Sequence, residues 1–295
     1  MYRISVAMAT RNEGAIISRT LASIKWADEL VLVDSGSTDD TVEIAKRYGA
    51  KVFQEDWKGY GAQVNSALDK CTSPWILTLD ADEVVSKELA TEIRSLLLAE
   101  PEFDAYTVPR LNFVLGKAML HGGLYPDRRL RLFRNGAARL PEDEEHHSSP
   151  VASVRTGRLS SPLLHYQYPT LDLYLEHMNR YSTTCVPRLM QQKEVGERSL
   201  RLLWNIVAKP AWMFFKNYVL RAGFLDGREA LIYHLNHSLY VHWKYVKAWD
   251  ACRRSRPSNM QISPADWEFH HDHSVFFPLD ETDIEAPKSE RSGLC

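Results

Sequence analysis

The sequence predicts an α/β protein with a mostly parallel sheet, helices on both faces and a C-terminal helical appendage. Through residues 4–79, short apolar segments alternate with segments whose apolar residues recur at helical spacing. Such alternation is typical of parallel sheets covered by helices. From residue 171 onward the pattern is largely helical. A chain of 295 residues can hold one large domain and such an appendage.

Each element follows from its local pattern. Apolar, β-favouring runs predict strands at residues 4–9, 29–34, 50–53, 75–79, 105–110 and 130–133. Helical spacing predicts helices at 15–24, 41–48, 59–68, 171–190, 200–220 and 227–250. The expected organisation is a nucleotide-binding and catalytic domain at 1–168, a helical region at 169–256 and a polar tail at 257–295.

The strand at 75–79 runs directly into Asp80, Asp82 and Glu83. Carboxylates spaced i, i+2 at a strand end can hold a hard cation such as Mg²⁺ or Mn²⁺, which keeps water or phosphate oxygens in its other positions. A nucleotide diphosphate is the natural partner of such an ion. The alternative is an acidic loop without a ligand, because this pattern also occurs by chance.

Two other strands deliver polar groups to the same edge. The segment Thr10–Gly14 follows the first strand, and the second strand ends on Asp34. Ligands of wound α/β sheets bind beyond the carboxyl ends of the strands. These residues therefore predict a nucleotide-sized crevice, with a solvated loop rim as the alternative.

Composition limits the classes of partner that the protein is expected to bind. A net charge of -2, from 36 basic and 38 acidic residues, gives no reason to bind nucleic acid. The four cysteines lie far apart, which favours reduced thiols and a cytoplasmic location. The segment Trp204–Lys216 combines aromatic residues with lysines, which suits either a membrane interface or ordinary helix packing. The oligomeric state is left open.

Several segments together resemble a known family. Ile4–Glu13 (ISVAMATRNE), Val31–Asp39 (VLVDSGSTD) and Leu77–Glu83 (LTLDADE) resemble the family 2 inverting glycosyltransferases of the GT-A fold. Further on, HGGLYPD at 121–127, RLFR at 131–134 and RAGFLDG at 221–227 are similar to the bacterial branch that adds β-linked glucose to the heptose of the lipopolysaccharide inner core.

The resemblance implies roles for the strand-end residues. It assigns uridine binding to Thr10, Asn12, Glu13 and Asp34. It also implies that Gln63 and Asn65 face the nucleotide, with a polar helix surface as the alternative. Asp80 would face the ribose or the metal, and Asp82 would bind the metal. His165 resembles the histidine that completes the metal shell in some of these enzymes, the alternative being a core histidine.

The sequence offers several candidates for the general base. Relatives place a His-Glu pair near residue 146, whereas this chain has two glutamates followed by two histidines. Glu145 is the first candidate for the base, and His147 or Asp127 are the alternatives. A third alternative is that the departure lowers activity.

The resemblance implies a metal-dependent, inverting transfer of glucose or another hexose from a UDP-sugar to a heptose of the lipopolysaccharide core. The expected location is the cytoplasm, at the inner face of the cytoplasmic membrane. One alternative is a transferase of the same fold with another glycan acceptor. Another is a nucleotide-sugar-binding protein with impaired catalysis. A dinucleotide-dependent reductase is disfavoured, because Thr10–Gly14 lacks the GxGxxG turn.

Overall fold

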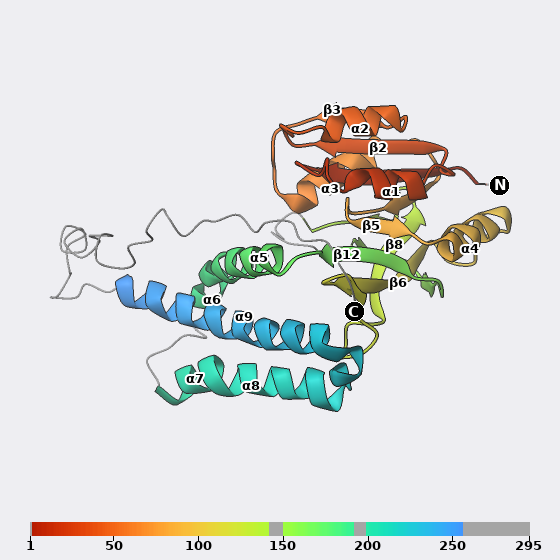
Figure 1. The fold of residues 1–295 in the computed structure, drawn as a ribbon. Helices are drawn as coiled ribbons and strands as arrows, with labels where there is room; N and C mark the ends of the chain where they lie inside the picture. Colours follow the sequence, from red (N-terminus) through yellow and green to blue (C-terminus); the bar gives the residue numbers. More distant parts are fainter. Residues whose placement is uncertain (1, 142–149, 192–198, 256–295) are drawn as a thin grey trace, which may run out of the picture. The chain divides into compact units, whose positions relative to one another are not determined.

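The computed structural model of the protein describes residues 2–141, 150–191 and 199–255 (Figure 1). Its strands are β1 (Ile4–Thr10), β2 (Glu29–Asp34), β3 (Lys51–Gln54), β4 (Trp75–Thr78), β5 (Glu83–Val85), β6 (Ala105–Val114), β7 (Lys117–Ala118), β8 (Asp127–Arg134), β9 (Ala138–Arg139), β10 (Val151–Ala152), β11 (Thr156–Arg158) and β12 (Leu163–Tyr168). Its α-helices are α1 (Ile17–Ser23), α2 (Thr41–Arg47), α3 (Tyr60–Asp69), α4 (Lys87–Leu98), α5 (Leu171–Thr184), α6 (Val186–Gln191), α7 (Ser199–Leu203), α8 (Lys209–Phe214) and α9 (Gly227–Arg254). Two π-helical segments, η1 (Trp204–Ala208) and η2 (Phe215–Leu220), and the 3₁₀ turn η3 (Gly223–Asp226) complete the set.

One mixed sheet organises the chain. Its order is β3-β2-β1-β4-β8-β6-β12-β5, and β7 and β11 also pair with β6. The half from β3 to β4 is parallel throughout, as the sequence predicts. β8 then joins antiparallel to both β4 and β6. The sheet is therefore wound in its first half and mixed in its second.

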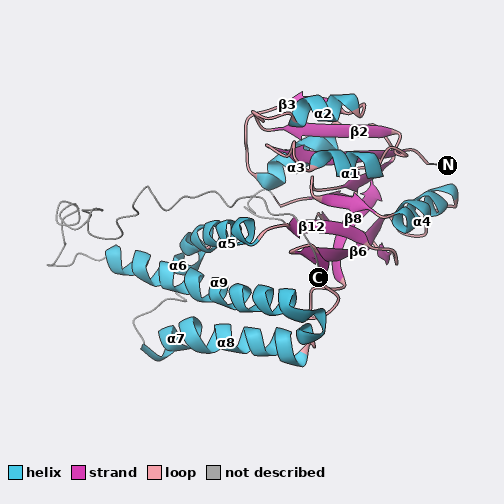
Figure 2. Cartoon of the chain, in the orientation of Figure 1, coloured by secondary structure: helices cyan, strands magenta, loops and turns pink. Residues whose placement is uncertain are grey.

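Helices cover both faces of this sheet (Figure 2). On β1, Val6 and Met8 face a core that includes residues of α1 and α4, whereas Ala7 faces a core that includes residues of α3. This alternation follows from the two-residue period of a strand. The predicted α/β fold with helices on both faces and a C-terminal helical region is confirmed.

Some boundaries differ from the predictions. Helix α4 was not predicted, although Ser86 caps it by accepting a hydrogen bond from the backbone N–H of Leu89 at 3.1 Å. The predicted helix at 171–190 is interrupted at Cys185. Pro187 lies just beyond, and because it has no backbone N–H it cannot bond the carbonyl oxygen of Thr183 and continue the helix.

The C-terminal helices pack on one another and on a loop of the sheet domain. His242 Nδ1 of α9 lies 2.7 Å from the carbonyl oxygen of Ile206. Asp226 accepts the backbone N–H of His121 at 2.7 Å, and its other oxygen lies 2.7 Å from Nδ1 of the same histidine. Two motifs about one hundred residues apart in sequence therefore meet. Residues 2–251 form one compact unit.

The described residues bear on two further expectations. Cys71, Cys185 and Cys252 are free thiols, while Cys295 and the predicted polar tail lie outside the described part. None of the helices in the described part is long and apolar enough to cross a bilayer.

Candidate active site

The carboxyl ends of β1, β2 and β4 meet at one edge of the sheet. β1 lies between the other two strands, and its parallel registers pair Thr10 with Asp34 and Ala7 with Thr78. The acidic turn at 80–83 follows β4 at this edge. Strand order thus brings the first-strand loop, the end of β2 and the aspartates to one rim, which is the arrangement that a ligand site in a wound sheet requires.

Asp34 is fully buried and shapes the loop around it. Its Oδ1 accepts the backbone N–H groups of Gly36 at 3.1 Å and Ser37 at 2.9 Å. Its Oδ2 accepts the hydroxyl groups of Ser37 and, at 3.4 Å, of Thr10. Both carboxylate oxygens therefore hold the loop in shape, and direct contact of Asp34 or Thr10 with a nucleoside stays a prediction.

The turn after β1 is fixed on the loop after β2. Asn12 adopts φ +56°, a left-handed conformation that asparagine tolerates better than most residues. Its backbone N–H donates to Ser37 Oγ at 2.8 Å, and its Oδ1 accepts the backbone N–H of Thr38 at 2.8 Å. The backbone N–H of Glu13 donates to the hydroxyl of Thr41 at 2.8 Å. These hydrogen bonds hold Glu13 at the rim.

The pKa of Glu13 reflects the negative charge of the site. Burial, together with the negative charges of Asp82, Asp39 and Asp80, raises the pKa of Glu13 from 4.5 to about 7. So many carboxylates close together favour either a retained proton or a bound cation. The rim therefore has the electrostatics of a cation site.

We expect binding of Mn²⁺ at this rim to release a proton. Below pH 7 a cation must displace the proton of Glu13, so the apparent affinity should rise by at most about tenfold per pH unit up to pH 7 and level off above it. Calorimetry at pH 6 in buffers of different ionisation heat counts the protons released. The variant Glu13→Gln should release fewer protons than the wild type, and equal release would contradict this role of Glu13.

A pocket of about 750 Å³ opens at the carboxyl ends of β2 and β3. This volume suits a nucleotide-sized ligand. Nothing in the sequence pattern singles out its cations or its half-exposed tryptophan, although Trp57 and Lys58 follow β3 and Arg11 follows β1 at the predicted rim. Its lining residues are Arg11, Ser35, Gly36, Gln54, Glu55, Asp56, Trp57 and Lys58. A pocket of about 500 Å³ lined by Arg3, Lys25, Glu29 and Lys51 lies at the amino ends of β2 and β3, away from the acidic turn.

Gln63 and Asn65 are both buried in α3, so neither lies on an exposed polar surface. The side-chain amide of Asn65 donates to the carbonyl oxygen of Leu140 and accepts its backbone N–H, both at 2.9 Å. Gln63 Oε1 accepts the backbone N–H of Lys58 at 3.4 Å. Asn65 thus ties α3 to a distant segment, Gln63 adjoins the 750 Å³ pocket, and nucleotide contact by either stays a prediction.

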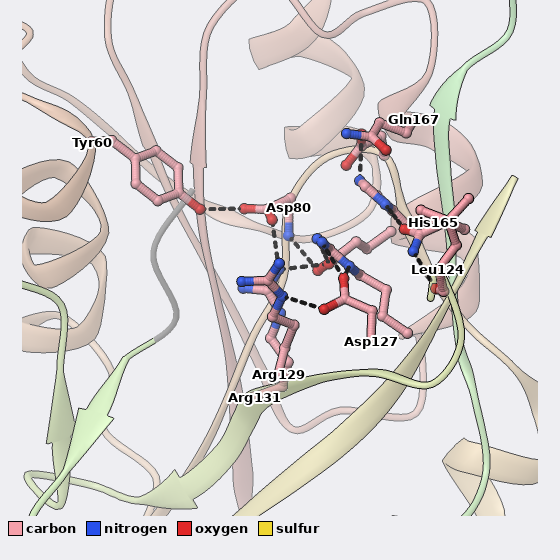
Figure 3. Close-up of polar contacts among 12 residues, drawn as sticks. Tyr60, Asp80, Leu124, Asp127, Arg129, Arg131, His165 and Gln167 are labelled. Carbon is pink, nitrogen blue, oxygen red and sulfur yellow. Dashed lines mark hydrogen bonds and ion pairs between the residues drawn. The ribbon is translucent and has the colours of Figure 1, made fainter. Parts of the chain in front are cut away.

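Asp80 is held by two side chains from other elements (Figure 3). Its Oδ1 accepts the hydroxyl of Tyr60 at 2.6 Å, and its Oδ2 lies 2.6 Å from a guanidinium nitrogen of Arg131. The same nitrogen lies 2.5 Å from Glu83 Oε1, and the Glu83 side chain is fully buried. Arg131 therefore balances two carboxylates and fixes the orientation of Asp80.

Asp127 continues this network (Figure 3). Its Oδ2 accepts two N–H groups of Arg110 at 2.6 and 2.9 Å, and its Oδ1 lies 3.0 Å from Arg129 Nε. Burial alone would raise the pKa of Asp127, but the charges of Arg110 and Arg129 outweigh it and lower the pKa. To act as a base, Asp127 would have to leave both arginines.

Asp82 faces His165. Asp82 Oδ2 lies 3.2 Å from His165 Nε2. Two ligands bound to one cation at about 2.1 Å and at right angles lie about 3 Å apart, so this pair fits neighbouring positions around a single ion. No group of three or more histidine, cysteine or acidic side chains in the described part is placed to hold a metal. The pair would therefore supply two ligands, and water and diphosphate oxygens the others.

Asn112 sets the tautomer of His165. Its Nδ2 donates to the carbonyl oxygen of Leu124 at 2.9 Å, so its Oδ1 is the atom that faces His165 Nδ1 at 2.6 Å. Nδ1 therefore donates to Asn112, and Nε2 is the ring nitrogen that faces Asp82. Figure 3 shows His165 beside Leu124, across the site from Tyr60.

We expect Asn112→Leu to weaken Mn²⁺ binding 10- to 100-fold, because loss of the partner that orients a metal histidine costs about this much. Calorimetric titration with UDP present measures the change. Asn135→Leu is the matched control, since Asn135 also donates to backbone carbonyls, of Cys71 and Ser73, but away from the rim. Equal Mn²⁺ affinity of Asn112→Leu and the wild type would show that Asn112 does not position His165.

Glu145 and His147 lie outside the described residues. Their proposed roles as bases therefore stay predictions.

Helix α5 adds residues that the sequence did not single out. The negative charge of Asp82 is felt at both His177 and Tyr181, after the larger effects of burial and of Arg180. Burial and the charge of Arg180 lower the pKa of His177, which favours its neutral form. Their i, i+4 spacing on the first helix after β12 was the available signal.

Comparisons with known proteins point to one family of enzymes. Residues 5–152 match the family model described as glycosyl transferase family 2. The chain is 31% identical over 235 residues to the lipopolysaccharide core biosynthesis glycosyltransferase LpsC of Rhizobium meliloti, which covers 75% of this chain and 85% of that protein. It is 30% identical over 252 residues to an uncharacterized glycosyltransferase of Rickettsia felis, covering 79% and 84%.

Among solved structures, the chain is similar to S. aureus TarS 1-349 in complex with UDP-GlcNAc, with 16% identity, a TM-score of 0.47 and coverage of 89% of this chain and 95% of that one. It is also similar to the mannosyltransferase PcManGT from Pyrobaculum calidifontis in complex with GDP-Man and Mn²⁺, with 17% identity, a TM-score of 0.49 and coverage of 84% and 88%. Likeness at this level identifies no substrate.

Proposed function

The chain belongs to glycosyl transferase family 2, and on that premise we propose that it is an inverting hexosyltransferase of lipopolysaccharide core assembly. It would move glucose, or another hexose, from a UDP-sugar to a heptose of the inner core. The observation that carries the metal-dependent reaction is the Asp82–His165 pair, in which Nε2 lies 3.2 Å from the carboxylate and Nδ1 is held by Asn112. The acceptor is supported by the likeness to LpsC over most of its length.

The donor would lie along the rim. We infer that the 750 Å³ pocket takes the nucleoside, with the Thr10–Glu13 turn and Asp34 shaping its wall. Asp80, held by Tyr60 and Arg131, would face the ribose or the metal. Asp82 and His165 would hold Mg²⁺ or Mn²⁺, which when bound neutralises charge on the departing diphosphate.

Inversion needs a base on the acceptor side. In a single displacement, the base removes the proton of the attacking heptose hydroxyl. Glu145 is our first candidate and His147 the second. Asp127 comes last, because the ion pairs with Arg110 and Arg129 lower its pKa and occupy both of its oxygens.

A donor and acceptor screen tests the proposal. The protein is incubated with UDP-glucose, UDP-galactose, UDP-GlcNAc or GDP-mannose, truncated core oligosaccharides and Mn²⁺ or Mg²⁺, and products are identified by mass spectrometry. We expect one hexose to be added from a UDP-sugar, with an inverted anomeric carbon by NMR. Transfer to another glycan would mean that the acceptor is not the lipopolysaccharide core, and UDP binding without any transfer would favour an impaired, nucleotide-sugar-binding protein.

Because UDP-sugars are soluble and this acceptor is lipid-borne, we place the reaction at the inner face of the cytoplasmic membrane.

A further inference from the structure

The C-terminal helices carry most of the exposed apolar side chains of the described residues. Of 22 large apolar residues that are exposed, fifteen lie between Leu200 and Trp249. Isolated exposed apolar residues are normal, but a concentration on one group of helices marks an interaction surface. We call six of the exposed apolar residues on α7 to η2 the C-terminal face: Leu203, Trp204, Val207, Trp212, Phe215 and Leu220.

The opposite side of these helices is already used. Asn205 and Pro210 are buried, and the carbonyl oxygen of Ile206 contacts Nδ1 of His242 on α9. Lys209 bonds the hydroxyl of Tyr245, also on α9. Packing against α9 therefore accounts for the inward side and leaves the C-terminal face exposed.

The surroundings of this face are cationic. Between Ser199 and Arg254 the chain has nine lysines and arginines but three acidic residues, although the whole chain is slightly negative. Arg201, Lys216 and Arg221 are exposed, whereas the acidic Asp226 is buried and Glu229 is paired with both Arg228 and Lys117. The surface thus combines apolar side chains with unbalanced positive charge.

This combination decides between two occupants. In a symmetric dimer the same patch would face itself, so the cations would oppose one another and charged groups would crowd an interface core that usually lacks them. An anionic bilayer instead takes up aromatic and aliphatic side chains in its interface and attracts the surrounding cations. Charge complementarity therefore favours lipid over a second copy.

We propose that the C-terminal face lies in the interfacial layer of a bilayer that contains anionic phospholipid. Trp204 and Trp212 enter the boundary between headgroups and acyl chains, and Arg201 and Lys216 reach lipid phosphates.

The proposal does not depend on the transferase reaction, but it adds to it. Beyond η2, the carbonyl of Arg221 accepts the backbone N–H of Gly122 at 2.9 Å, in the loop that leads to Leu124. Leu124 holds Asn112, the partner of His165. The face and the proposed metal site are thus linked, and a lipid-borne acceptor would be held near both.

Flotation of the full chain with vesicles tests this without donor or acceptor. Vesicles of phosphatidylcholine alone are compared with vesicles that also contain phosphatidylglycerol, at low and high salt. We expect binding to the anionic vesicles, weakened by salt, and at least about tenfold weaker for Trp204→Glu/Trp212→Glu. Arg201→Gln/Lys216→Gln should bind roughly 25-fold more weakly, since each cation near an anionic surface contributes about fivefold.

Leu98→Glu is the matched control, because Leu98 is 65% exposed at the end of α4, outside this face. It should bind vesicles like the wild type. Circular dichroism and UDP binding show that each variant is folded. Equal binding by the tryptophan variant, indifference to phosphatidylglycerol, or a dimer in light scattering that only the tryptophan variant dissociates would overturn the proposal. Failure of the donor screen would leave the vesicle result unaffected, so the two can fail separately.

Discussion

Replacing Asp82 by asparagine is expected to lower hexose transfer by about 10²–10³-fold at saturating donor and Mn²⁺. Asparagine keeps the shape of the side chain but removes the negative charge that faces His165 Nε2 at 3.2 Å. A cation would then lose one of the two ligands that the pair supplies. The effect should fall mainly on kcat, because the cation acts on charge that develops in the transition state. Initial rates of hexose transfer measure it.

Asp40→Asn is the matched control for this variant. Asp40 is exposed beside α2, on the same side of the sheet, and its side chain makes no capping hydrogen bond. It should retain wild-type activity, and both variants should unfold at the wild-type temperature. If Asp82→Asn transferred sugar as fast as Asp40→Asn, the assignment of Asp82 to the metal would be wrong.

The second large effect is expected on stability. Arg131→Met should lower the free energy of unfolding by about 3–5 kcal/mol, because it leaves Glu83 and Asp80 without their shared cation in a buried site. Burial would lower the pKa of Arg131, but Asp80 and Glu83 raise it well above its usual value, so the guanidinium is charged in the folded protein. The midpoint of thermal unfolding should fall by roughly 6–15 °C.

Two further variants separate this effect from loss of an ordinary ion pair. Arg139→Met breaks a pair with Asp69 in which both side chains are more than half exposed, and it should cost at most about 1 kcal/mol. Adding Glu83→Gln to Arg131→Met should recover part of the lost stability, since the buried charge left alone is then removed. A loss in Arg131→Met no larger than in Arg139→Met would contradict a buried network.

Much of the first half of the fold could be predicted from local pattern. Alternation of apolar runs with helical spacing gave the strands and helices up to residue 79, and the parallel order followed from their succession. Helix α4 shows the limit of prediction from local pattern. It is absent from the predicted elements, although Ser86 caps its start. The break at Cys185 was also missed, although Pro187 was visible in the sequence.

Partners from distant segments were not predictable in this way. Asn65 is predicted to face a nucleotide, and the sequence does not show that it also bonds Leu140, 75 residues away. Asp127 was a candidate base, yet Arg110 and Arg129 hold it. A polar residue at a predicted position reveals its chemical type, whereas its hydrogen-bond partner depends on which strands lie side by side.

The sequence by itself determined that polar or acidic groups follow three of the strands and that these strand ends share one edge, because the strand period and the handedness of parallel crossovers are local rules. Only the tertiary structure decided what each acid does there. Asp34 closes a loop, Asp80 pairs with Arg131, and Asp82 meets a histidine that Asn112 has oriented. These choices arise from contacts across the sheet and between loops, where distance in space has no fixed relation to distance along the chain.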